Sequence, residues 1–214
     1  GRTYGIATQA SAEANAVGVR QLGRNEEGLG TSSLTNSASG SIVATANAVA
    51  SGGYSYDDCG EDCSSANIRA LAQASGVHQF AATYASYSEG PELGALAEIT
   101  NNGTIRAVSF ADASASSGGA AGAYASAFGA RQYAEAEDGD ATVTTTNTAS
   151  NSIEAYSNAR AIGDRLALAD AAATGDFQSV STASGNALAL LENTGAIFAT
   201  ALAYANATSF ETCS

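Results

Sequence analysis

The sequence predicts an all-β protein: an Ala-rich β-solenoid or stacked β-sheet repeat architecture with Gly and Asn turns and inserted loops. Three observations favour this class. Alanine recurs at every second position over long stretches, a phrase opened by isoleucine returns several times, and a glycine motif returns at the far end of such stretches. Self-similarity over long periods with polar turns is typical of solenoids and stacked arrays. We therefore expect a single elongated β-repeat domain over residues 1–214.

The clearest predicted strand is the last one, Ala196 to Ala207. Ile197 and a series of alanines occupy alternate positions, and aromatic, aliphatic and polar residues fill the positions between them. Side chains of an extended strand point to opposite faces with a period of two, so one face carries mostly methyl groups. Burial of alanine removes little apolar surface, so stability has to come from backbone hydrogen bonds and the close packing of thin layers.

The same phrase returns along the chain after segments rich in asparagine and glycine. Its copies align on an opening isoleucine at Ile6, Ile42, Ile68, Ile105, Ile153 and Ile197. The segments that precede most copies are Asn36-Ser37, Asn101-Asn102-Gly103, residues 147–151 and Asn193-Thr194-Gly195. Asparagine and glycine tolerate positive φ, so each such segment is predicted to be a tight turn that leads into a strand.

A second motif marks the other end of the alternating stretches. Its copies are Gly18-Val19-Arg20-Gln21, Gly76-Val77-His78-Gln79, Gly129-Ala130-Arg131-Gln132 and, more loosely, Gly163-Asp164-Arg165-Leu166. An isolated glycine within a strand indicates a bulge or a corner. The spacing between copies is uneven, which predicts inserted loops at about residues 51–65 and 114–122.

Helices are the competing interpretation, because alanine has the highest helix propensity. Burial of a helix face requires apolar residues at spacings of three and four, whereas alanine here recurs at a spacing of two. Only Leu166 to Ala173 remains a candidate helix.

The charge of the chain argues against several partners. Eight arginines, no lysine and 21 acidic residues give a net charge of −13, which disfavours nucleic acid and anionic membrane surfaces. No run of about 18 apolar residues is present, so no membrane insertion is expected. The sequence contains no methionine, which predicts that Gly1 follows a removed leader or begins a fragment. We expect a secreted or cell-surface protein.

The Asn-x-Gly-x-Ile-x-Ala phrase, followed by alternating alanine, resembles the repeats of bacterial surface proteins of the autotransporter-passenger and filamentous-adhesin type. The resemblance covers most of the chain. It implies a right-handed parallel β-solenoid, export, and a role in adhesion or in a biofilm matrix. Two features depart from that pattern: the units are uneven, and alanine replaces the usual Val, Ile and Leu of the interior. An interior of small residues implies sheets packed close together.

No constellation of residues predicts catalysis, and no cofactor is expected apart from the calcium considered below. His78, the only histidine, stands where other copies of its motif carry arginine, which predicts a polar role beside the corner. A threonine-rich strand is formed by Thr142, Thr144, Thr145, Thr146 and Thr148. Ice-binding surfaces need such an array in successive coils, so a solvent-facing strand is the favoured interpretation.

The cysteines and the acidic loops predict covalent and ionic links. A disulfide between Cys59 and Cys63 would leave Cys213 for an intermolecular bond, and pairing of Cys213 with one loop cysteine is the alternative. Calcium is a candidate ligand for two acidic groups, Asp57, Asp58, Glu61 and Asp62 in one and Glu137, Asp138 and Asp140 in the other. Their spacing matches no calcium motif, so solvated loops are favoured.

The leading functional hypothesis is an extracellular structural protein, not an enzyme, that self-associates head to tail into a filament or surface layer. Uncapped strands near both ends would pair with another copy by β-strand addition. The expected assembly residues are Ile197, Phe198, Leu202 and Tyr204. The alternative is a ligand-binding fragment of a bacterial adhesin or autotransporter passenger. A polysaccharide-degrading enzyme ranks last, since it would need carboxylates that converge on one face.

Overall fold

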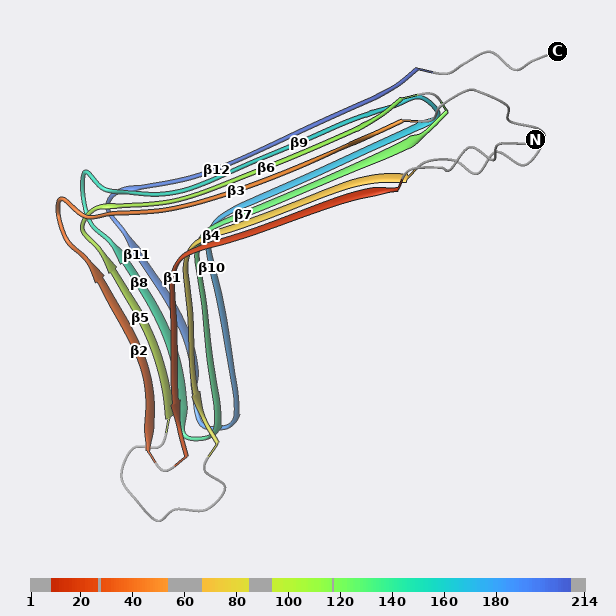
Figure 1. The fold of residues 1–214 in the computed structure, drawn as a ribbon. Coiled ribbons are helices and arrows are strands. Elements are labelled where there is room, and N and C mark those ends of the chain that lie inside the picture. Colours follow the sequence, from red (N-terminus) through yellow and green to blue (C-terminus); the bar gives the residue numbers. More distant parts are fainter. Residues whose placement is uncertain (1–8, 27, 54–66, 85–93, 117, 209–214) are drawn as a thin grey trace, which may run out of the picture.

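The computed structural model describes residues 9–26, 28–53, 67–84, 94–116 and 118–208. All regular structure within these residues is β-strand, so the predicted all-β class is confirmed and the candidate helix at Leu166–Ala173 is wrong. Twelve strands form three parallel sheets of four strands each (Figure 1). Neighbours within a sheet are three strands apart along the chain, so the chain winds as a solenoid of four coils.

Each coil contributes one strand to each sheet. The first strands of the coils form sheet A: β1 (Ala10–Asn25), β4 (Asn67–Thr83), β7 (Ala120–Asp138) and β10 (Leu166–Ser184). The second strands form sheet B: β2 (Leu29–Asn36), β5 (Gly94–Asn101), β8 (Asp140–Asn147) and β11 (Ala187–Asn193). The third strands form sheet C: β3 (Ser41–Gly52), β6 (Thr104–Ala115), β9 (Ser152–Gly163) and β12 (Ala196–Ala207).

The solenoid is L-shaped because the long strands of sheet A bend near their middle (Figure 1). The first half of each sheet A strand packs against sheet C and forms one arm. The second half packs against sheet B and forms the other arm. Sheet A therefore lines the inner side of the L, while sheets B and C form its outer side.

The glycine of the second motif lies at the bend and permits it. A Cβ atom on Gly129 would lie 2.6 Å from Cγ2 of Ile153 and closer still to the carbonyl oxygen of Gly175. The same contact recurs in the other coils as Gly18 with Ile42, Gly76 with Ile105 and Gly175 with Ile197. The isoleucine that opens each sheet C strand thus packs onto backbone that carries no side chain, and the two sequence motifs are the two halves of one contact.

This contact corrects the alignment of both motifs. The fourth copy of the glycine motif is Gly175-Asp176-Phe177-Gln178, whereas Gly163 ends β9. Ile68 lies in sheet A and does not belong to the isoleucine column at the bend. Ile6 lies outside the described residues.

The structure agrees with the predicted turns but not with the full extent of the predicted loops. The asparagine-containing segments do connect sheet B to sheet C in every coil, as predicted. The predicted loop at 114–122 is only partly a loop, because β6 runs to Ala115 and β7 begins at Ala120. Of the predicted loop at 51–65, Ser51 and Gly52 end β3, and residues 54–65 lie outside the described part of the chain.

Alanine fills the arm between sheets A and C in columns that run from coil to coil. Ala48, Ala111 and Ala159 form one such column, and none of them is more than 2% exposed. Methyl groups make up most of the filling between the two layers, which is interrupted by Ile68 and by the buried hydroxyls of Ser109 and Ser157. The layers therefore pack close together, as the composition predicted.

Two ladders of buried amides also run along the solenoid. Asn36, Asn101, Asn147 and Asn193 end the strands of sheet B, and Nδ2 of Asn101 donates to Oδ1 of Asn147 at 2.8 Å. The same Nδ2 donates to the backbone oxygen of Ser152 at 3.0 Å, which fixes the orientation of the amide because a carbonyl oxygen cannot donate. Each asparagine donates toward coil 4. The glutamines of the second motif run the opposite way, with Gln132 donating to Gln79 at 3.0 Å and Gln79 to Gln21 at 2.6 Å.

Candidate assembly interface

Within the described residues, both ends of the solenoid have sheet edges that no further strand covers. The strands of coil 1 and of coil 4 stand at opposite edges of all three sheets, and no other strand of the described residues pairs with their outer sides. Backbone N–H and C=O groups along such an edge are available to pair with another chain. Each end therefore offers three strands for pairing.

The two ends are complementary in shape because the sheets are offset along the solenoid axis. In sheet C, β3 packs between β1 and β4, β6 between β4 and β7, and β9 between β7 and β10. β12 has only β10 to pack against, since coil 4 is the last coil of the described residues. Sheet C therefore projects by half a step at coil 4, and sheet A projects by half a step at coil 1.

At coil 4, no element of the described residues covers the apolar interior. Ala203 continues the column of Ala48, Ala111 and Ala159, but it is exposed because no sheet A strand covers it from the far side. In the other arm, Leu191 is 46% exposed, whereas its neighbour two coils earlier, Ile99, is fully buried. An exposed apolar patch of this kind is typical of an interaction surface.

The amide ladders end at the same two surfaces with complementary groups. At coil 4, Nδ2 of Asn193 and Oε1 of Gln178 have no hydrogen-bond partner among the described residues. At coil 1, the ladder atoms that would meet them are Oδ1 of Asn36 and the second N–H of the Gln21 amide, whose first N–H donates to the backbone oxygen of Ser33. In the asparagine ladder, coil 4 thus offers a donor and coil 1 an acceptor. In the glutamine ladder, coil 4 offers an acceptor and coil 1 a donor.

Asp176 interrupts the interior at coil 4. Its column in sheet A holds Val19, Val77 and Ala130 in the earlier coils. Burial raises the pKa of Asp176 to about 6, and a hydrogen bond donated by the Thr145 hydroxyl at 3.4 Å opposes that rise. A coil stacked on coil 4 would bury this carboxyl further, beside an apolar column.

The four predicted assembly residues do not share one face. Ile197 points into the solenoid, where it packs against Gly175. Phe198, Leu202 and Tyr204 are exposed on the outer face of sheet C, to the side of the stacking direction. The open end instead exposes the inward-facing alanines of β12 together with Leu191. Sequence reasoning missed them, although the alternation that places alanine on the inner face was the available signal.

His78 lies beside the bend, as its motif predicted. It stands between Arg20 and Arg131 of the neighbouring coils, and Phe177 rather than Arg165 completes this column. Burial lowers the pKa of His78, and the charges of Arg131 and Arg20 lower it further.

Of the three calcium candidates that the structure describes, Asp138 and Asp140 form hydrogen bonds beside the turn between β7 and β8, and Glu137 is exposed on β7. Asp138 accepts a hydrogen bond from the Ser184 hydroxyl at 2.6 Å, and Asp140 accepts one from the backbone N–H of Asn186 at 2.8 Å. No group of three or more acidic, histidine or cysteine side chains in the described residues is placed to hold a metal ion. The other calcium candidates, Asp57, Asp58, Glu61 and Asp62, lie outside the described residues, as do the predicted disulfide cysteines Cys59, Cys63 and Cys213.

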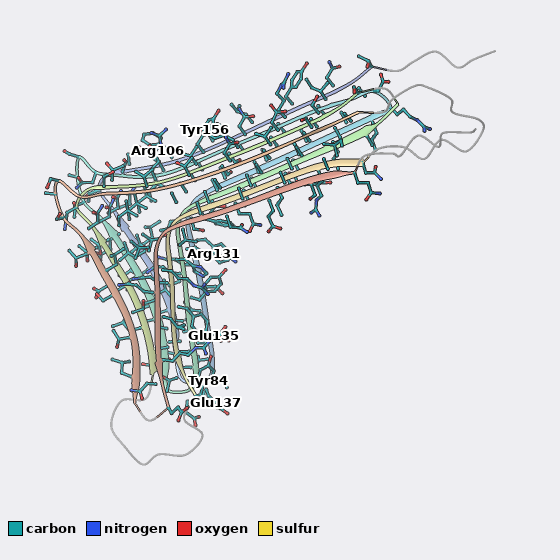
Figure 2. All side chains as sticks on the ribbon, viewed as in Figure 1. Tyr84, Arg106, Arg131, Glu135, Glu137 and Tyr156 are labelled. Carbon is teal, nitrogen blue, oxygen red and sulfur yellow. The ribbon has the colours of Figure 1, made fainter. Side chains whose placement is uncertain are left out.

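The threonine-rich strand carries threonines on both of its faces. Thr142, Thr144 and Thr146 lie on the outer face of β8, whereas Thr145 is buried and donates to Gln132 at 2.5 Å. An open depression of about 320 Å³ lies on the inner side of the second arm, where Glu135, Glu137 and Tyr84 are among its lining residues (Figure 2).

None of the described elements is a helix with the length and apolar character needed to cross a membrane. Comparisons of the chain with protein-family models, with curated proteins and with solved structures found no match. The resemblance to bacterial surface repeats therefore stays a prediction from the sequence.

Proposed function

We propose that the chain is an extracellular, non-enzymatic structural protein whose copies stack head to tail into a filament or surface layer. The observation that carries the proposal is the match between its ends, where sheet C projects at coil 4 and sheet A projects at coil 1. Coil 1 of one copy would take the place of a fifth coil on the copy before it. A head-to-tail contact that does not close on itself generates filaments.

The amide ladders favour this polarity. In a head-to-tail stack, Nδ2 of Asn193 would donate to Oδ1 of Asn36 in the next copy, and Oε1 of Gln178 would accept from Gln21. Two copies joined through like ends, with each ladder meeting its own counterpart, would oppose donor to donor or acceptor to acceptor. A buried polar group left without a partner costs about 1–3 kcal/mol, so like-end pairing is disfavoured.

Strand addition would extend all three sheets at once. The alanines of β1, which are partly buried in the free subunit, would cover those of β12 across the junction. Main-chain hydrogen bonds would supply the affinity, and the interdigitated interior would set the register. The extracellular setting rests on the acidic, lysine-free composition and on the resemblance of the repeats.

A substitution inside the open end tests the proposal. Ala203→Arg places a long cation at an inward-facing position that is exposed in the free subunit and would be enclosed by a stacked copy. We expect this variant to fold normally and to lose the filaments that negative-stain electron microscopy and sedimentation detect for the unmodified chain. Thr200→Arg adds the same charge to the outer face of the same strand and should still assemble.

The outcomes separate the possible interfaces. Assembly of the Ala203→Arg variant at the same concentration as the unmodified chain would rule out stacking through β12. Equal loss in both variants would assign the association to the outer face of sheet C. An unmodified chain that stays monomeric at every concentration would contradict the filament and leave the adhesin fragment as the function to test.

A further inference from the structure

Arginine and aromatic side chains gather on the inner side of the L, beside the bend of sheet A. We name them the elbow cluster: Arg20, Arg24, Phe80, Arg131, Tyr133 and Phe177. The register brings them together, because Arg20, Arg131 and Phe177 stand in one column across the coils, and Phe80 and Tyr133 stand in the next. Neighbouring strands of a sheet lie about 4.8 Å apart, so the cluster extends along the axis. Figure 2 shows Arg131 on this inner side.

Contacts within the elbow cluster hold two of its three arginines, Arg24 and Arg131, against aromatic rings. The guanidinium of Arg131 lies 5.1 Å from the ring centre of Tyr133 and 5.9 Å from that of Phe177. The guanidinium of Arg24 lies 5.7 Å from the ring centre of Phe80. Such cation–π contacts position a guanidinium without neutralising it. The rings of Tyr133 and Phe177, 5.7 Å apart, continue the aromatic strip from coil to coil.

No carboxylate neutralises these arginines in the described residues. The ion pairs that the structure does contain join Arg106 to Glu154 at 3.6 Å and Arg160 to Asp112 at 3.2 Å, both on the outer face of sheet C. Arg20, Arg24 and Arg131 have no such partner in the described part of a chain whose net charge is −13. The elbow cluster is therefore a local concentration of positive charge on an acidic molecule.

We propose that the elbow cluster binds an acidic polysaccharide of the uronic-acid class, with its carboxylates paired to the arginines and its sugar rings stacked on the aromatic side chains. A guanidinium matches a carboxylate through two parallel N–H···O hydrogen bonds. The apolar C–H faces of a sugar ring suit an exposed aromatic surface. The strip is open at the sides, so a long polymer can lie across it.

A nucleic acid is the competing polyanion, and Glu135 and Glu137, which lie on the same face of β7 beyond Tyr133 (Figure 2), would repel its phosphates as they would repel uronic-acid carboxylates. The choice of a polysaccharide therefore rests on the extracellular setting of the proposed function, and single-stranded DNA is included in the test as the competing ligand. The elbow cluster lies to the side of each coil, so it stays open when copies stack, and this binding role goes beyond filament formation.

The test measures binding of the full chain to polygalacturonate, a linear uronic-acid polymer, by isothermal titration at low and high salt. We expect binding that weakens with salt, and no binding to dextran, a neutral polymer. The double variant Arg20→Gln/Arg24→Gln removes two exposed cations and should weaken binding by about tenfold or more. Arg106→Gln/Arg160→Gln removes the same charge from the outer face and should change the affinity by less than about twofold.

A third variant separates stacking from charge. Phe177→Ala removes a ring that is 37% exposed and leaves every charge in place, and it should also weaken binding. Far-UV circular dichroism should show unchanged strand content in all variants. The proposal would be overturned by absence of binding at low salt, by equal binding of dextran, by equal loss in the two double variants, or by tighter binding of single-stranded DNA than of polygalacturonate.

Discussion

At the scale of single residues, the glycine at each bend is a position where the fold leaves no room for a side chain. A methyl group on Gly129 would meet Cγ2 of Ile153 at 2.6 Å and the backbone of Gly175, neither of which is the end of a flexible side chain. We expect Gly129→Ala to lower the free energy of unfolding by about 1–3 kcal/mol, the usual cost of overpacking a filled interior. Urea denaturation monitored by circular dichroism measures this change.

Gly122 provides the matched control on the same strand. A methyl group there would lie 3.2 Å from a ring carbon of Tyr124, whose side chain can rotate away. Gly122→Ala should therefore leave stability unchanged or raise it slightly, because alanine restricts the unfolded chain more than glycine does. Equal destabilisation by the two substitutions would contradict a specific role for the bend.

At the scale of elements, the asparagine ladder ties the ends of the sheet B strands together. Asn101 is fully buried, accepts from Asn36 at 2.8 Å, and donates to Asn147 and to the backbone of Ser152. We expect Asn101→Ala to cost about 2–4 kcal/mol, because buried groups on both sides lose a partner. Thermal and urea unfolding check this value.

Asn158 is the control for loss of an amide outside the ladder. It lies on the outer face of β9 and makes a long hydrogen bond of 3.4 Å to the Tyr156 hydroxyl. Asn158→Ala should change stability by no more than about 0.5 kcal/mol. A comparable loss in both variants would show that the ladder is no stronger than an ordinary surface contact.

The sequence revealed the strands but not their assignment to sheets. Alternation with a period of two is a local property, so it identified β12, but it left Leu166–Ala173 as a candidate helix, which the structure shows to be the start of β10. Alternation does not show to which sheet a strand belongs, so the sequence alone places Ile68 with the isoleucines of sheet C. The copy at Gly175-Asp176-Phe177-Gln178 went unrecognised for a similar reason, since only the glycine of the bend and the glutamine of the ladder are kept there.

At the scale of the whole molecule, the proposed stacking interface could not be predicted from the sequence. The sequence favours the outer-face residues Phe198, Leu202 and Tyr204 for assembly, because large apolar residues usually mark a contact. The proposed stack depends instead on the offset between sheets A and C, which arises from the packing of four coils rather than from any one strand. Inward-facing alanines, inconspicuous in the sequence, become the exposed surface at coil 4.

Ionisation of Asp176 at the coil 4 end makes the stability of the folded subunit depend on pH. Its pKa of about 6 lies above the value in the unfolded chain, so the folded subunit binds the proton more tightly. Stability therefore falls as pH rises from about 4 to about 6 and is flat with respect to this group above that range. A stacked copy would bury Asp176 further, against Val19 of the next subunit, and would raise the pKa again.

Filament formation should consequently weaken as pH rises above about 6, because the stacked state then holds a proton that the free subunit has lost. For each further unit by which stacking raises the pKa of Asp176, the critical concentration for assembly at high pH increases about tenfold. Sedimentation at pH 6 and pH 8 measures the effect.

Asp176→Asn keeps the shape of the side chain without its charge and should assemble at pH 8 as readily as at pH 6. Asp170→Asn, exposed on the same strand, removes an equal charge and should keep the pH dependence. If Asp170→Asn abolished the dependence as completely, general repulsion between acidic subunits, rather than burial of Asp176, would govern assembly.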